Sequence, residues 1–388
     1  MTEAYLDHAG GGIIDGRVQE AMQAVLTQIP ASAHGLHRWA ERSHGAIEEA
    51  RQSVAELVGA EPHWVIFTAG PTEARNLAVK GALAANRLLG RGIITSIADH
   101  PATLSACRSA TREMGGPTLA PIDLDGRVDI PGLREQDWSD TALVCLPQAQ
   151  AEIGTIQPLA ELVAAVRGSR ADTLIHVDAG DSIGLCPINM SELDIDFLTI
   201  GGASVGAPPW TGALVVRPGT RLYPLIEGGV QEHGKRAGAE DVPSIAGFGR
   251  AAQIAVAEGA DIIRRVDALG QSLTSRLLAI PDVRLLGPSQ GRLPGHVSVA
   301  AFRVEAQTLV LALAEHGVAA SPGSACTAVT RRVSPVLEAI GVTPPWTHSA
   351  VLFTLGSGTT SEEVEYGAEV VARCVASLRE FSPIRIEE

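Results

Sequence analysis

Residues 64–89 read WVIFTAGPTEARNLAVKGALAANRLL, and this stretch decides the fold. Its first part, WVIFTAG (64–70), is a short apolar run that ends at a glycine and predicts a strand. Its second part, PTEARNLAVKGALAANRLL (71–89), predicts a helix. The stretch therefore predicts a strand that leads directly into a helix.

The same order of elements recurs along the chain. Helices are expected from Pro101 and from about Pro158, each after an apolar strand. The predicted strands are GIITS (92–96), ALVCLP (142–147), DTLIHVDA (172–179) and DFLTIGG (196–202). Alternating strands and helices imply right-handed crossovers and a mostly parallel sheet, so we predict an α/β fold. TGALVVRP (211–218) predicts a further strand, as an antiparallel neighbour.

The last third of the chain predicts a smaller α+β unit. A long helical stretch at about 243–279 leads into it. Its predicted elements are a strand at 296–302, an amphipathic helix at 306–316, the segment VAAS (318–321) and a last helix at 361–380. We expect a large domain at 13–255, and a small domain made of 1–12 and 256–388.

Composition excludes several classes of partner. The net charge of −14 argues against nucleic acid or an anionic membrane as the main partner. The opening MTEAYLDHAGGG has no basic or apolar leader, and no apolar run approaches a membrane span. Five dispersed cysteines with no CxxC pair predict reduced thiols, so we expect a cytoplasmic protein.

Four polar residues follow the ends of predicted strands. They are Thr72, His100, Asp178 and Ser204. Ligands of open parallel sheets bind at the carboxyl ends of the strands. The pattern therefore predicts a ligand site that these residues share.

Motifs along the whole chain resemble the class V aminotransferase family, specifically cysteine desulfurases of the NifS/IscS type. In order, they are YLDHAG, IFTAGPTEARNLAVKG, ITSIADHPA, AEIGTIQPLAEL, IHVDAGDSIG, GALVVRPG, GGVQEHGKRAGAEDVPSIAG, SPGSACT and LFTLGSGTT. The resemblance implies a homodimeric fold type I enzyme of the pyridoxal-phosphate (PLP) class, with a mostly parallel seven-stranded sheet. Such enzymes move sulfur from cysteine onto a mobile cysteine as a persulfide and release alanine.

Three parts of the implied PLP pocket are retained. The phosphate loop appears as residues 69–74, with Gly70 and Thr72, although Pro71 removes one N–H donor. His100 matches the histidine that stacks on the cofactor ring. Asp178 matches the aspartate that pairs with the pyridinium nitrogen. A buried aspartate needs a partner, which could be a proton, an arginine, a metal or a cofactor.

Seven polar positions of the implied pocket are lost. Ser204 stands where the family has its Schiff-base lysine, and a hydroxyl cannot form an imine. Asp181 replaces a glutamine that donates to the phenolic oxygen of the cofactor, and an ionised carboxylate only accepts. The other lost positions are Gly201, Ala203, Ala151, Ala239 and Leu352, the last replacing the arginine that clamps the substrate carboxylate. The resemblance therefore implies that covalent PLP is absent.

The remaining reactive groups are few. The chain has two lysines, of which Lys80 lies in a helix and Lys235 in a loop. Cys326 occupies the position of the persulfide-bearing cysteine, and the nearby Arg331 and Arg332 would favour its thiolate. The other four cysteines are expected to be core thiols.

Two functions therefore compete, with a third behind them. The first is a non-catalytic homodimer that relays sulfur, handles an iron–sulfur cluster at Cys326, or serves as a partner subunit. The second is a PLP-independent enzyme that uses His100, Asp178, Asp181 and Ser204, with no metal motif in the sequence. The third is a protein that binds PLP non-covalently.

Overall fold

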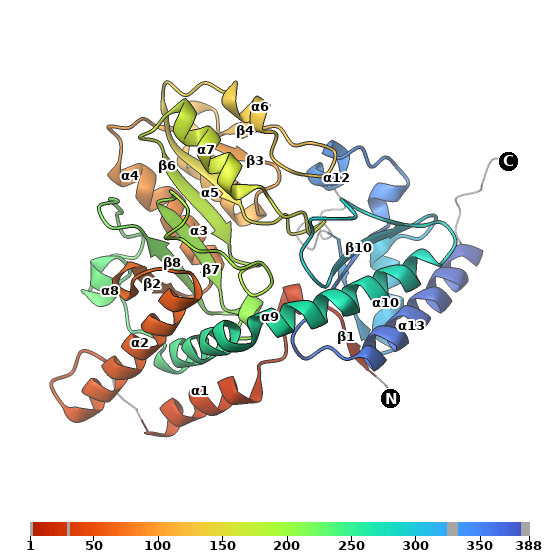
Figure 1. Ribbon diagram of the computed structural model, residues 1–388, viewed down its shortest axis with the longest axis horizontal. Coiled ribbons are helices and arrows are strands. Elements are labelled where there is room, and N and C mark those ends of the chain that lie inside the picture. Colours follow the sequence, from red (N-terminus) through yellow and green to blue (C-terminus); the bar gives the residue numbers. More distant parts are fainter. Residues whose placement is uncertain (1–2, 29–31, 324–332, 382–388) are drawn as a thin grey trace.

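The computed structural model describes residues 3–28, 32–323 and 333–381. Within them, a seven-stranded sheet has the order β2-β8-β7-β6-β5-β3-β4 (Figure 1). Its strands are β2 (Val65–Thr68), β3 (Gly92–Ser96), β4 (Thr118–Ala120), β5 (Thr141–Pro147), β6 (Leu174–Ala179), β7 (Phe197–Gly201) and β8 (Gly212–Val216). All neighbours are parallel except β8, which is antiparallel to both β7 and β2. The predicted α/β fold, its seven-stranded sheet and its antiparallel strand are confirmed.

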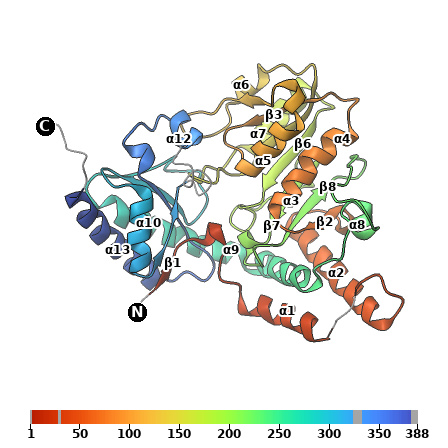
Figure 2. The same ribbon diagram turned by 180° about the vertical axis from the view of Figure 1, so that it is seen from behind.

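Helices cover both faces of this sheet. Alternate residues of β2 show the division: Val65 and Phe67 pack in one apolar cluster, and Ile66 packs in the other. Figure 1 shows α7 in front of the sheet, and Figure 2, from behind, shows α3 and α5 in front of it. The first face carries α1 (Gly16–Gln28), α2 (Arg38–Leu57), α7 (Leu159–Ser169) and the start of α9 (Val242–Leu278). The second face carries α3 (Pro71–Asn76), the π-helical turn η3 (Leu77–Gly81), α4 (Ala82–Ala85) and α5 (Pro101–Ala110).

A second sheet forms the core of the smaller unit. Its order is β12-β13-β10-β9, with every pair antiparallel. The strands are β9 (Val283–Leu285), β10 (His296–Ala301), β12 (Ser321–Pro322) and β13 (Ala350–Thr354), and the main helices are α10 (Ala306–Glu315) and α13 (Ser361–Glu380). The N-terminal strand β1 (Ala4–Tyr5) pairs with β11 (Val318–Ala319), so the described N-terminal residues pack on this unit.

Helix α9 joins the two cores. Its first half contributes Phe248 and Ala252 to the core of the large sheet, and its second half contributes Val266 and Leu273 to the core of the small one. The predicted domain boundaries near residues 13 and 255 remain a proposal. No helix in the described ranges is long and apolar enough to cross a membrane.

The remaining short elements complete the connections. They are η1 (His8–Gly10), η2 (Pro62–Trp64), η4 (Arg112–Met114), α6 (Ile130–Arg134), η5 (Ala203–Val205), α8 (Gln231–Gly234), α12 (Pro335–Ala339) and η6 (Trp346–His348). Of these, η1 and η5 lie against each other and bring the N-terminal segment to the carboxyl end of β7.

Candidate functional site

The loop between β2 and α3 is the implied phosphate loop. Gly70 has a φ of 109°, a conformation that L side chains rarely adopt, and it lets the chain turn sharply into α3. The N–H of Ala69 already donates to the Glu73 carboxylate at 2.9 Å, and Thr72 is exposed. A carboxylate of the chain itself therefore occupies one donor that an anion would need.

Asp178, at the end of β6, has an arginine as its partner. Arg75, whose side chain is 2% exposed, donates from Nε to Oδ2 of Asp178 at 2.7 Å. Thr103 and the N–H of Gly180 also donate to the same carboxylate. Burial alone would raise the pKa of Asp178, but the Arg75 guanidinium outweighs it and holds that pKa well below its usual range. The question left open by the sequence is answered by Arg75, a residue that sequence reasoning missed.

Arg75 also binds Asp181. Its second terminal nitrogen donates to Oδ2 of Asp181 at 2.6 Å, so one guanidinium joins two carboxylates. Gly180 makes room for it, because a Cβ there would lie 2.5 Å from Nη2 of Arg75. Glycine at residue 180, between the two aspartates, is the one signal in the sequence that could have pointed to a bulky neighbour.

His100 lies beside this cluster and starts helix α5. Its Nδ1 accepts from the N–H of Ala102, and its Nε2 is 3.9 Å from Oδ2 of Asp181. Burial lowers the pKa of His100, and the Arg75 guanidinium lowers it further. The ring therefore favours its neutral form.

Ser204 lies in the turn after β7. Its hydroxyl donates to the carbonyl oxygen of Gly201 at 2.9 Å. The turn is packed against Gly184, where a Cβ would lie 1.8 Å from the carbonyl oxygen of Ser204. The hydroxyl proton is thus held by the backbone rather than by a catalytic base.

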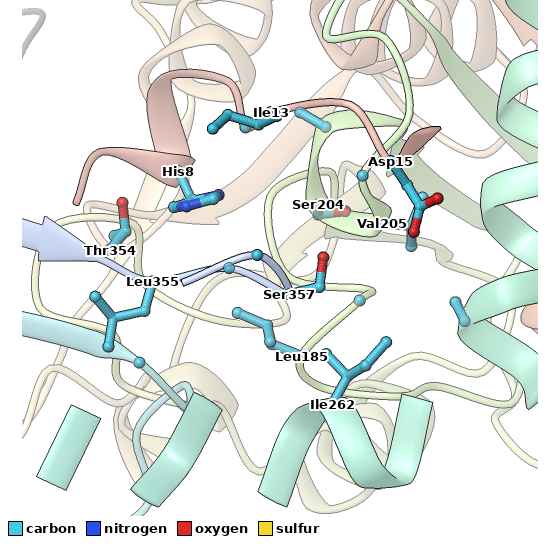
Figure 3. Close-up of a pocket in the computed structure, with 18 of the residues that line it drawn as sticks. His8, Ile13, Asp15, Leu185, Ser204, Val205, Ile262, Thr354, Leu355 and Ser357 are labelled. Atoms are coloured by element: carbon cyan, nitrogen blue, oxygen red, sulfur yellow. The ribbon is translucent and has the colours of Figure 1, made fainter. Parts of the chain in front are cut away.

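Asp181 and Ser204 share the wall of a cavity of about 520 Å³, whereas Asp178, His100 and Thr72 lie outside its lining. The cavity lies between the N-terminal segment, the turn after β7, helix α9 and the loop after β13. Figure 3 shows Ile13 on one side and Leu185 and Ile262 on the opposite side. The hydroxyls of Ser204 and Ser357 come from separate walls. Only part of the predicted set of residues therefore meets around one space.

The lysines and cysteines have the following positions. The Lys235 ammonium donates to the carbonyl oxygen of Leu222 at 2.9 Å, so it is held in its own loop. Cys107, Cys145 and Cys374 are buried as expected, but Cys186 lies half-buried in a turn rather than in a helix or strand. Cys326 lies outside the described residues. In the described part of the chain, no three His, Cys, Asp or Glu residues gather as a metal ion would require.

The comparisons with known proteins agree with this fold. A model of the family described as aminotransferase class-V matches residues 4–366. Cysteine desulfurase IscS of Dictyoglomus turgidum is 37% identical over 386 residues, covering 99% of this chain and 98% of that protein. The chain belongs to the class V aminotransferase family, in its cysteine desulfurase group.

Other cysteine desulfurases of this family are similar over nearly their whole length. Cysteine desulfurase IscS 1 of Archaeoglobus fulgidus is 35% identical over 380 residues, covering 98% of this chain and 99% of that protein. The solved structure of a NIFS-like protein superposes with a TM-score of 0.90 at 28% identity, covering 97% of this chain and 100% of that one. The fold is thus that of the PLP-dependent fold type I proteins.

The residues of this chain do not fit PLP, the cofactor that the desulfurase family implies. Asp178 is bound by a cation of the protein, where the family resemblance places the pyridinium nitrogen. The same resemblance places the carboxylate of Asp181 where the phenolic oxygen would need a donor. The resemblance also places Ser204, which has a hydroxyl, where a Schiff base would require an amine.

Proposed function

We propose that this chain is a cytoplasmic member of the cysteine desulfurase family that does not hold PLP as a Schiff base and does not release alanine from cysteine. It serves instead as a sulfur-relay, iron–sulfur-handling or partner subunit through Cys326. The observation that carries the proposal is the ion pair between Arg75 and Asp178, with 2.7 Å between Nε and Oδ2.

This ion pair competes directly with the cofactor. A pyridinium nitrogen could reach Asp178 only by displacing Arg75, and the guanidinium would then stay buried with less compensation. Breaking a buried pair in this way costs about 3–5 kcal/mol, or roughly a hundredfold to a few thousandfold in affinity. The carboxylate of Asp181 would add repulsion against the phenolic oxygen and the phosphate.

Sulfur relay needs only a thiolate and a persulfide donor. The Cys326 thiolate attacks the outer sulfur of the donor persulfide, the donor S–S bond breaks, and the donor leaves as a thiolate. Cys326 then carries the sulfur as a persulfide, and no oxidant or reductant is consumed. Arg331 and Arg332 are the nearest cations in the sequence and favour the thiolate.

A homodimer is part of the same proposal. The segment that leads into the inter-subunit loop of the family exposes Tyr223, Leu225, Ile226 and Val230, each at 40% or more. Neighbouring apolar side chains in solvent are typical of an interaction surface, and a second copy of the chain is the proposed occupant. Light scattering at micromolar concentration should give the mass of a dimer.

The alternative of a PLP-independent enzyme has less support from the geometry. Asp178 is committed to Arg75, and the Ser204 hydroxyl is committed to the backbone. His100 and Asp181 remain as an acid–base pair at 3.9 Å, without a nucleophile among these four residues.

The test begins with the purified full chain and added PLP. We expect no borohydride-reducible chromophore and no alanine from cysteine. A reduced adduct mapped to any lysine, or turnover that depends on Cys326, would overturn the proposal. To isolate Arg75, S204K should bind PLP more weakly than S204K/R75A; equal affinity would remove the argument from the ion pair.

The relay is tested separately. After incubation with glutathione persulfide, mass spectrometry should find one added sulfur atom on Cys326. The variant C326S should lose it, and C186S, which changes another cysteine that is not fully buried, should keep it. Sulfur on Cys186 but not on Cys326 would contradict the relay.

A further inference from the structure

The cavity beside Asp181 and Ser204 has no role in the proposed function. Its volume of about 520 Å³ lies within the range that small-molecule sites occupy. Apolar side chains line opposite sides, with Ile13 facing Leu185 and Ile262 (Figure 3). The space therefore suits a compact molecule with an apolar part.

Two polar groups of the lining can accept hydrogen bonds from a ligand. The hydroxyl of Ser204 donates its hydrogen bond to the carbonyl oxygen of Gly201, so only its lone pairs are free to bind a ligand. Asp181 uses Oδ2 for Arg75 and is 41% exposed, so its other oxygen is open to a donor.

His296 is a buried member of the lining. Its Nε2 is 2.9 Å from the carbonyl oxygen of Ala151, and a carbonyl only accepts, which assigns the ring proton to Nε2. Nδ1 is buried and lies on the side of Gly154, which is outside the cavity lining, so it is not an acceptor for a ligand. Burial lowers the pKa of His296 to about 4, so the ring stays neutral at pH 7 and adds no positive charge to the wall.

The carboxylate of Asp181 favours a positive ligand. Arg75 is the single cation paired with Asp178 and Asp181, so this group keeps one net negative charge. Asp15 and Glu258 share Arg17, and Arg250 also acts on both, so they add no net negative charge. Arg265 lies at the exposed rim, where it donates to the carbonyl oxygen of Ser357. The protein as a whole has a net charge of −14, which attracts cations.

We propose that this cavity binds a small organic cation with a primary ammonium group. The ammonium donates to Asp181 and to the hydroxyl of Ser204, and the apolar part lies between Ile13, Leu185 and Ile262. The inference rests on the proposed function, because a resident cofactor would take Asp181 and Ser204 into its own site.

The experiment is calorimetric titration of the full chain, first shown to be colourless, with n-butylamine. n-Butanol tests the need for charge, and tetramethylammonium tests the need for N–H donors. We expect butylamine to bind at least tenfold more tightly than either, because hydrogen bonds that involve charged groups are the strong ones. Equal affinity for butanol, or no heat with millimolar butylamine, would overturn the inference.

Variants place the ligand in the cavity. D181N should weaken butylamine binding about tenfold or more. The control D172N changes another aspartate that pairs with an arginine, Arg170, and lies outside the cavity lining; it should bind as the wild type does. L185F should reduce binding by filling the apolar side, with circular dichroism to confirm the fold. Unchanged binding by D181N and L185F would place the amine elsewhere and sink the inference.

Failure of this inference can be told apart from failure of the proposed function. If the protein is colourless and does not bind butylamine, only the inferred amine site is wrong. A protein that forms a reducible PLP adduct loses the proposed function, whatever its response to amines.

Discussion

Arg51 and Arg75 are two buried arginines with similar partners. They differ in where the outer carboxylate of each cluster lies. Each joins a buried carboxylate to a more exposed one: Arg51 joins Glu232 to Glu48, and Arg75 joins Asp178 to Asp181. The outer carboxylates have nearly the same side-chain exposure, 44% for Glu48 and 41% for Asp181. Glu48 lies on the outside of α2, whereas Asp181 lies on the wall of a cavity.

The inner carboxylates differ as well. Glu232 takes both terminal nitrogens of Arg51 at 2.8 Å and also accepts from the N–H of Phe67. This pair ties the loop at 231–234 to β2, although Glu232 has a positive φ of 47°. Asp178 instead has a further buried acid near it, Asp99. The first cluster closes on itself and holds a loop, and the second leaves negative charge where a ligand could use it.

Removing Arg75 should produce the largest effect. R75A leaves Asp178 buried without its cation, and we expect a loss of about 3–5 kcal/mol in the free energy of unfolding at pH 7. Urea denaturation measures it. R108A, on an exposed residue of α5, should stay within about 0.5 kcal/mol of the wild type.

If R75A does not fold, R75A/D178N provides the answer. This pair removes both charges and should recover at least half of the loss. A double variant no better than R75A would show that packing, rather than charge, is what Arg75 supplies.

The pH dependence should distinguish the second cluster. Burial, with a contribution from Asp178, raises the pKa of Asp99 to about 7. A raised folded pKa means that stability is full below pH 4 and is lost as pH rises towards 7. D99N should therefore gain roughly 3 kcal/mol on the wild type between pH 5 and pH 8. The exposed control D172N should follow the wild type. A stability difference between D99N and the wild type that does not change with pH would refute the raised pKa of Asp99.

Glu232 tests the closed cluster. E232Q keeps the shape but removes the charge, and we expect a loss of about 2 kcal/mol by urea denaturation, because hydrogen bonds to charged groups are worth roughly 1.5–3 kcal/mol. Butylamine binding should not change, since Glu232 does not line the cavity. A weaker amine response in E232Q would erase the distinction between the two clusters.

The smallest effect should come from Ser204. S204A removes one hydrogen bond to the backbone, at a cost of about 1 kcal/mol in thermal or urea unfolding. A loss above 3 kcal/mol would mean that the hydroxyl has a buried partner other than Gly201.

Much of the fold could be predicted because apolar runs mark buried strands. The strand at 92–96 and the helix at 361–380 have the bounds expected from the sequence. Helix α2 begins at Arg38, but its first turns are largely exposed and carry little apolar periodicity, so the pattern does not mark its start. The helix expected over 71–89 ends at Ala85 and contains a π-helical turn. Apolar periodicity marks the part of a helix that packs against the core. It gives no signal for helical turns that remain exposed.

The site could be predicted only in outline. The sequence indicated that Asp178 needs a partner but not which one, because Arg75 is 103 residues away along the chain. Helix α3 follows β2 and packs against β8 and β7, which lie between β2 and β6. The space left by Gly180 then lets the guanidinium reach both aspartates. Such pairings depend on tertiary packing, which local patterns do not encode.

Helix α9 has a consequence for how the molecule comes apart. One uninterrupted helix of 37 residues is rooted in both apolar cores. Unfolding of either core would remove the packing contacts of one half of α9 and destabilise the other half. A helix in water draws most of its stability from packing. The two halves of the protein are thereby obliged to melt as one cooperative unit, and heating in a calorimeter should give a single peak.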